Sequence, residues 1–200
     1  LSGDAGNDTF VVATTGAGFT GLTIAETVSG GAGNDTLQFA AGIVAIAASD
    51  LVNMSGIENI EIQNTTQTAG LTLTDATFTT NGATTLAVNS VTATSGVLTL
   101  AASTLSAANS VQLNLAGAAN TAVHNVVLGA GSDTVTIDMD ALNNTAITIQ
   151  GGAGTDTMVF TENTADATVA VSAAVTGFEN VSFITGLGGA FAATVNDANV

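Results

Sequence analysis

The stretch Gly30-Gly31-Ala32-Gly33-Asn34-Asp35-Thr36-Leu37 decides the fold of this 200-residue chain. Its three glycines favour a tight turn, because glycine adopts positive φ values without steric cost. From Thr36 to Phe39, polar and apolar residues alternate, which is typical of a strand with one buried face. The stretch therefore predicts a glycine-rich turn that carries one acid and leads directly into a strand.

This pattern recurs along the chain. Similar segments begin at Gly3, Gly129 and Gly151, and two shorter relatives begin at Gly56 and Gly177. In two further copies the acid is replaced. The residues at the acid position of the eight copies are Asp8, Asp35, Glu58, Thr84, Asn109, Asp133, Asp156 and Glu179. Successive positions lie 23 to 27 residues apart, and such even spacing is typical of a repeat architecture.

A repeat of about 24 residues that contains two or more short strands predicts an all-β chain folded as a parallel β-solenoid (β-helix). Stacked rungs would place like residues on like. The first expected internal ladder is Phe10, Leu37, Ile60, Leu86, Val111, Val135, Met158 and Val181, and the second is Val12, Phe39, Ile62, Val88, Leu113, Ile137, Phe160 and Phe183. Later in several rungs comes a second apolar pair: Leu22/Ile24, Leu71/Leu73, Leu98/Leu100, Ile147/Ile149 and Val169/Val171. Helix is not expected, because Thr, Val, Gly and Asn are weak helix formers.

A longer period lies above the rungs. Residues 30–63 match residues 151–184 at an offset of 121, which equals five rungs. We therefore expect one solenoid segment over residues 1–200, made of a five-rung block at about 1–121 and an incomplete block at about 122–200. The incomplete block and the absence of an initiator Met lead us to interpret the chain as a piece of a longer repetitive protein.

The charge of the chain is entirely one-sided. It contains no Lys or Arg against 16 Asp and Glu, for a net charge of −16, and it has no Cys. Nucleic acid is not expected as a partner, because phosphate binding relies on Lys and Arg. Membrane insertion is not expected either, since no apolar run approaches the roughly 18 residues that a span requires. Disulfides cannot stabilise the fold, so a divalent metal is the expected substitute.

The acidic turns are the expected metal sites. Stacked rungs lie about 4.8 Å apart, and two carboxylates at that distance repel by about 3 kcal/mol at an effective dielectric near 20. Ca²⁺ binds oxygen at roughly 2.3–2.6 Å, so an ion midway between two stacked carboxylates fits both distances. We therefore predict calcium sites at the Asp8/Asp35 and Asp133/Asp156 pairs.

The remaining polar positions divide into several kinds. Asp4 lies inside a metal turn and is a candidate for a further ligand. Glu58 and Glu179 occupy the acid position without the preceding glycine run, and two roles stay open for them: an added ligand to the neighbouring site, or a turn cap. Thr84 and Asn109 are interpreted as purely structural turn residues. We expect Asp138 and Asp140 to face solvent, His124 to be a surface or turn residue, and Met54, Met139 and Met158 to fill gaps in the core.

The acidic segments resemble the nonapeptide G-G-x-G-x-D-x-U-x of RTX proteins. Gly30 to Gln38 and Gly151 to Val159 match it in full, whereas Gly3 to Val11 and Leu128 to Thr136 each miss one glycine. The resemblance implies that Asp8, Asp35, Asp133 and Asp156 supply carboxylate ligands, with backbone carbonyls of the glycine-rich turns completing the shell. The chain departs from that family in one respect: RTX β-rolls repeat the motif every nine residues, whereas here it occurs once per long rung.

The whole chain resembles RTX-type bacterial surface-layer (S-layer) proteins in its Ala-, Thr-, Gly- and Asn-rich composition and in the segments Ser55–Ile60 and Thr176–Val181. This likeness implies a structural, calcium-dependent component of a self-assembling layer at the bacterial cell surface, exported by type I secretion. Its partners would be other copies of itself, with cell-surface polysaccharide bound through regions outside this segment. The stalk of a large secreted RTX adhesin is the alternative.

A calcium-dependent polysaccharide-modifying β-helix enzyme is a remote second alternative. Such chemistry needs a positioned base and groups that stabilise developing charge. The chain has no Tyr, Lys or Arg and a single His. We therefore expect no catalysis.

Overall fold

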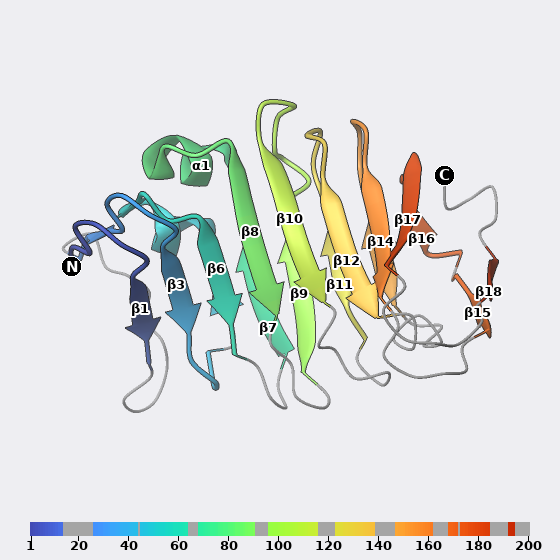
Figure 1. Cartoon of the computed structure of the whole chain (residues 1–200), viewed down its shortest axis with the longest axis horizontal. Coiled ribbons are helices and arrows are strands. Elements are labelled where there is room, and N and C mark those ends of the chain that lie inside the picture. The colour runs from blue at the N-terminus through green and yellow to red at the C-terminus, as the bar shows by residue number, and fades with distance from the viewer. Residues whose placement is uncertain are drawn as a thin grey trace.

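The computed structural model describes residues 1–13, 26–43, 45–63, 68–90, 96–115, 123–138, 147–161, 168–171, 173–184 and 192–194. This part of the chain is a parallel β-solenoid with a repeat of about 25 residues, which confirms the predicted fold class. Figure 1 shows the strands of its longer sheet side by side in chain order, from β1 to β17.

Two larger parallel sheets form the walls of the solenoid. The eight-stranded sheet has the order β1 (Thr9–Val12), β3 (Thr36–Phe39), β6 (Asn59–Ile62), β8 (Thr85–Ser90), β10 (Ser110–Leu115), β12 (Thr134–Asp138), β14 (Thr157–Thr161) and β17 (Asn180–Ile184). The six-stranded sheet has the order β16 (Val175–Thr176), β13 (Thr148–Gln150), β11 (Asn125–Val127), β9 (Val97–Ala101), β7 (Thr68–Thr72) and β4 (Ala45–Ile46).

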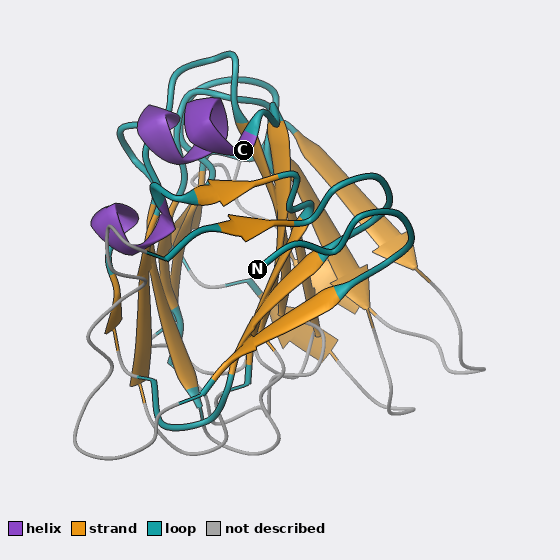
Figure 2. Ribbon diagram, turned by 90° about the vertical axis from the view of Figure 1, so that its left-hand side faces the viewer, coloured by secondary structure: helices purple, strands orange, loops and turns teal. Residues whose placement is uncertain are grey.

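Smaller elements complete the described structure. Two short parallel pairs are β2 (Val28–Ser29) with β5 (Met54–Ser55), and β15 (Thr168–Ala170) with β18 (Ala192–Thr194). A 3₁₀ helix, η1, spans Ala48–Leu51, and an α-helix, α1, spans Asp75–Asn81. Figure 2 shows the two larger sheets facing each other, with the helices at one end of the strands.

The core lies between the two sheets and follows from the alternating sequence pattern. In β3 and β6 the apolar residues are buried while their polar neighbours are only half-buried, and in β14 burial alternates in the same way, with Met158 and Phe160 buried. The facing sheet contributes one continuous apolar ladder through its registered pairs: Ile46, Leu71, Leu100, Val126, Ile149 and Val175. Burial of such side chains contributes about 25 cal/mol per Å² of apolar surface, so the ladders are the main source of cohesion.

The expected ladders of the long sheet are correct within groups of strands but wrong at two junctions. Ile60 pairs with Val88 and not with Leu86, and Val135 pairs with Leu113 and not with Val111. Each junction is shifted by two residues. Because side chains alternate with a period of two, an even shift keeps the same face inside. The apolar pattern therefore could not distinguish the two registers.

Three further expectations are corrected. Helix α1 exists: its own residue Phe78 is buried, and Gly82 ends the helix with a φ of 77° while its N–H donates to the Phe78 carbonyl. A seven-residue helix is too short for a 3.6-residue periodicity to show in the sequence. Val169, expected in the second apolar pair of its rung, lies in β15, and Val175 is the residue that pairs with Ile149 in the facing-sheet ladder. Phe183, expected inside, is 40% exposed, because β17 has a neighbour on one side only within the described sheet. The pair Leu22/Ile24 lies outside the described residues.

Two polar residues expected at the surface are buried instead, His124 and Asp138. Met54 and Met158 are buried in the core, as predicted, whereas Met139 and Asp140 lie outside the described residues. His124 accepts a hydrogen bond at Nδ1 from the Leu98 backbone N–H at 3.1 Å. That bond joins two neighbouring rungs, whereas the other ring nitrogen, Nε2, is buried without a partner. Its isolation in the sequence gave no hint of this role.

His124 should make stability depend on pH. Burial lowers its pKa to about 4, so between about pH 4 and 6.5 the unfolded chain takes up a proton that the folded chain does not. Stability should therefore fall as the pH drops below 6.5, by up to about 3 kcal/mol from this residue. Denaturant unfolding in saturating calcium at several pH values should show a steeper loss for the parent than for His124→Gln. Equal pH dependence of the two proteins would contradict the assignment.

Candidate metal centre

In each stack, acidic side chains accept hydrogen bonds from the backbone of the preceding rung. The Oδ1 atom of Asp35 accepts a hydrogen bond from the Asp8 backbone N–H at 2.8 Å. Asp156 does the same for the Asp133 N–H at 2.7 Å, and Asp133 for the Val111 N–H at 2.6 Å. Each of these carboxylates is therefore anchored by one oxygen to the rung before it.

The second oxygen of each Asp has no hydrogen-bond partner. The Oδ2 atoms of Asp8, Asp35, Asp133 and Asp156 are all buried and unpaired. A buried ionised carboxylate is strongly unfavourable unless it is paired with a charge or coordinates a metal. The chain has no Lys or Arg that could serve as the charge. A cation from solution would supply the charge that these four oxygens lack.

The electrostatics of the second stack point the same way. Burial raises the pKa of Asp133 to about 6, against the hydrogen bond from Val111, and the nearby Asp156 adds to the rise. Burial likewise raises the pKa of Asp156, and the charge of Glu179 adds to that effect. Both carboxylates thus lose their proton less readily than usual unless a cation compensates the charge.

Glycines approach the free oxygens of Asp8, Asp35 and Asp156 closely. A Cβ atom built on Gly30 would lie under 3.0 Å from both Asp35 Oδ2 and the Gly56 carbonyl oxygen. The same holds at Gly3, for Asp8 Oδ2 and the Gly30 carbonyl, and at Gly151 a Cβ would approach Asp156 Oδ2 and the Gly177 carbonyl similarly. A carboxylate oxygen and a carbonyl oxygen of the next rung therefore converge at these glycines.

This donor set fits calcium. Ca²⁺ takes carboxylate and carbonyl oxygens in a flexible shell, whereas transition metals favour imidazole or thiolate. Among the residues that the structure describes, no three His, Asp or Glu side chains gather into one cluster. The ligands would therefore come partly from the backbone, as the RTX resemblance implies. The carbonyls of Gly56 and Gly177 were not singled out from the sequence, although both begin a degenerate copy of the turn.

Glu58 and Glu179 continue the two stacks with a longer side chain. The Oε2 atom of Glu58 accepts the Asp35 N–H at 2.7 Å, and that of Glu179 accepts the Asp156 N–H at 2.7 Å. The pairs Asp35/Glu58 and Asp156/Glu179 thus repeat the same hydrogen bond. Both glutamates cap the backbone of the preceding acid, while an added ligand role for them stays a prediction.

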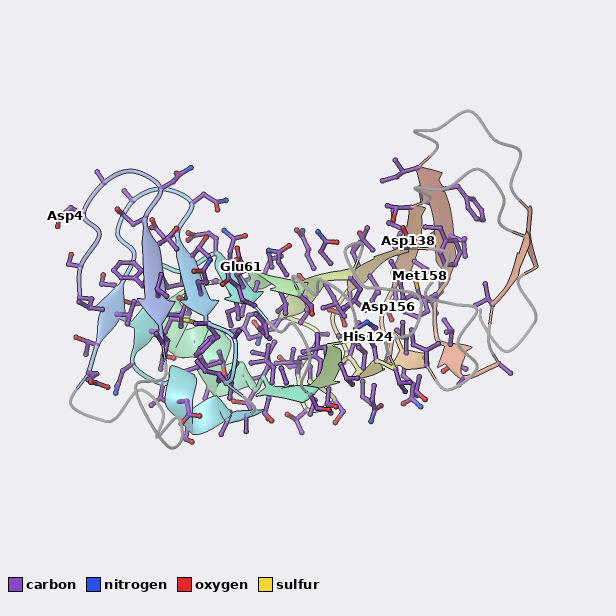
Figure 3. All side chains as sticks on the ribbon, turned by 90° about the horizontal axis from the view of Figure 1, so that it is seen from below. Asp4, Glu61, His124, Asp138, Asp156 and Met158 are labelled. Atoms are coloured by element: carbon purple, nitrogen blue, oxygen red, sulfur yellow. The ribbon has the colours of Figure 1, made fainter. Side chains whose placement is uncertain are left out.

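Asp4 takes the place that a glycine holds in the fully matching turns. Its φ is 66°, in the left-handed region, which Asp tolerates better than most residues. Its carbonyl oxygen accepts the Ala32 N–H, and its exposed carboxylate accepts a hydrogen bond from the Ser2 hydroxyl at 3.2 Å. Figure 3 places it at the outer edge of the molecule. A ligand role for this carboxylate stays a prediction.

Comparison with known families agrees with the geometry. A family model described as the RTX calcium-binding nonapeptide repeat matches residues 20–42 and 148–161, which contain the two complete motifs. No curated protein and no solved structure gives a significant match. The chain therefore carries RTX calcium-binding repeats, and its ligand is Ca²⁺. Such repeats are typical of secreted extracellular proteins. Within the described residues, no helix has the length and hydropathy that crossing a membrane requires.

Bound calcium supplies the positive charge that the stacks lack. The chain's own contribution is to fix one oxygen of Asp35, Asp133 and Asp156 by a backbone hydrogen bond and to place the free oxygen of Asp8, Asp35 and Asp156 close to a glycine. The carboxylates are thereby held before the ion arrives, which lowers the entropy lost on binding.

Removing a free oxygen should remove calcium. Asp35→Ala and Asp156→Ala should each lower the number of ions bound and destabilise the fold by about 2.7 kcal/mol per lost site at 100 times Kd. Thr84→Ala and Asn109→Ala are the matched controls and should leave the number of ions unchanged. Calorimetric titration with calcium gives these numbers directly. Full calcium binding by Asp35→Ala, or a loss caused by Thr84→Ala, would show that the sites are misplaced.

Proposed function

We propose that this segment is a structural, calcium-dependent component of a self-assembling bacterial surface layer, exported by type I secretion. The RTX repeats already imply a calcium-binding structural repeat region of a secreted protein. The observation that carries the finer proposal is the repetition of one calcium turn in two equivalent blocks of one continuous parallel stack. Such a stack is a building unit whose length and surface are set by repetition.

The outer face of the long sheet supports contacts between copies. One outward row of registered residues is Thr9, Thr36, Asn59, Ala87, Gln112, Thr134, Thr157 and Asn180. None of these side chains is buried. Beside this row, Gln38 and Gln63 both donate hydrogen bonds to Glu61. The row is neutral and offers mostly hydroxyl and amide groups, which suits wet, side-by-side contacts between identical faces.

The net charge explains why such contacts would need calcium. Copies that carry −16 each and no cation repel one another in solution. Divalent ions bound at the turns lower that charge and allow close approach. Assembly and folding would thus respond to the same ion.

The stalk of an RTX adhesin remains the alternative, since the same parallel stack also suits an extended rod. We propose no catalytic role for the segment. Its one His is buried, with Nδ1 engaged by the Leu98 backbone. Turnover of an anionic polysaccharide in calcium would overturn that part of the proposal.

Electron microscopy of the purified full-length protein tests the proposal. In calcium we expect ordered two-dimensional sheets that disperse when EGTA is added. Isolated filaments in calcium would favour the adhesin stalk. For the 200-residue chain, light scattering in calcium should show association that grows with concentration, and a strictly monomeric chain would contradict self-assembly.

A further inference from the structure

The rungs between the two acidic stacks are closed by the protein itself. These rungs form the central segment, defined as residues 68–90 and 96–115, which contain β7, α1, β8, β9 and β10. Asp75 is the one acid between residues 68 and 115, although the chain has 16 in all. Helix α1 directly precedes β8, where the calcium rungs have a glycine-rich turn (Figure 1). Two side chains, Asn81 and Asp75, join the rungs here.

Asn81 takes over the role of the acid at the first junction. Its side-chain carbonyl accepts the Ile57 N–H at 2.9 Å, and its amide donates to the Ile57 carbonyl at 2.5 Å. Its backbone carbonyl also accepts the Gly56 N–H at 3.0 Å. Both polar atoms of this buried side chain are therefore paired, and none is left for a cation. Asn81 joins the rungs as a neutral clamp.

Asp75 forms the second protein-made clamp. Its Oδ1 atom accepts three hydrogen bonds, from the Ser106 N–H at 3.0 Å, the Ser106 hydroxyl at 3.1 Å and the Asn109 amide at 2.7 Å. The hydrogen bonds from Ser106 and Asn109 lower the pKa of Asp75. The start of α1 is thereby tied to the turn of the next rung. Asn109 stands where other rungs have an acid, and its side-chain amide donates a hydrogen bond to Asp75.

The central segment differs from the two acidic stacks on either side of it, which contain buried carboxylate oxygens without a partner. Each acidic stack holds two Asp oxygens that are buried without a partner, whereas the one buried, unpaired side-chain atom found in the described residues of the central segment is the neutral Ser90 hydroxyl, at the end of β8. The two-residue register shifts between β6 and β8 and between β10 and β12 mark the borders. Across the second border, Asp133 faces Val111 and not another acid.

We propose that the central segment is calcium-independent, so that it keeps its structure when calcium is removed while the two flanking stacks open. The proposal rests on the calcium role of those stacks. It makes the solenoid a metal-free core with a calcium-dependent arm on each side. Chelation would then loosen the arms without unfolding the whole segment, and restored calcium would close them on an existing template.

Hydrogen–deuterium exchange of the 200-residue chain, with and without EGTA, tests this. In EGTA, amides of β8, β9 and β10 should stay protected, while those of residues 3–12, 30–39, 129–138 and 151–161 should exchange at least about tenfold faster. Loss of protection throughout would overturn the central core but leave the calcium role standing. Protection retained throughout would overturn calcium dependence itself, and with it the proposed function.

A matched pair of variants tests the clamp. In EGTA, Asp75→Ala should accelerate exchange in β8 and β10 by about tenfold or more, because three hydrogen bonds to a charged acceptor are lost. Asp50→Ala is the control: Asp50 caps η1 by accepting the Ala47 N–H at 2.8 Å and lies outside the central segment. Equal exchange in the two variants would show that Asp75 does not hold the central rungs.

Discussion

The structure has to accommodate buried carboxylate oxygens in a chain that contains no Lys or Arg. Parallel stacking places the acids of Asp35, Asp133 and Asp156 against the backbone of the preceding rung, and these three residues and Asp8 each keep one buried, unpaired oxygen. Calcium bound there would supply the missing positive charge. Glycines pack so closely against the free oxygens of Asp8, Asp35 and Asp156 that any side chain at those positions would clash with them.

This constraint also explains why the rungs are not all alike. Where two acids stack, each Asp keeps a buried oxygen without a partner. At Asn81 and Asp75 the polar groups are paired within the chain. Glu58 and Glu179 stand at the end of an acidic stack, and each caps the Asp before it. The rungs of one continuous sheet therefore differ in how their buried polar groups are paired.

Prediction from the sequence succeeded where repetition multiplied a weak signal. Eight copies of one turn set the solenoid, the strands and the Asp positions, and the pairing of Phe10 with Leu37 or Val135 with Met158 followed. It failed where the deciding interaction joins distant rungs. The shift that pairs Ile60 with Val88 leaves the apolar pattern unchanged, α1 is too short to show periodicity, and the burial of His124 depends on a backbone N–H 26 residues away.

The central claim is that calcium supplies the missing charge of the acidic stacks. Thermal unfolding of the 200-residue chain by circular dichroism, in saturating calcium and in excess EGTA, tests it most directly. Two or more sites at 100 times Kd should raise the melting temperature by about 10 °C or more, and EGTA should also remove part of the β-sheet signal before heating. An identical melt in EGTA would contradict the claim.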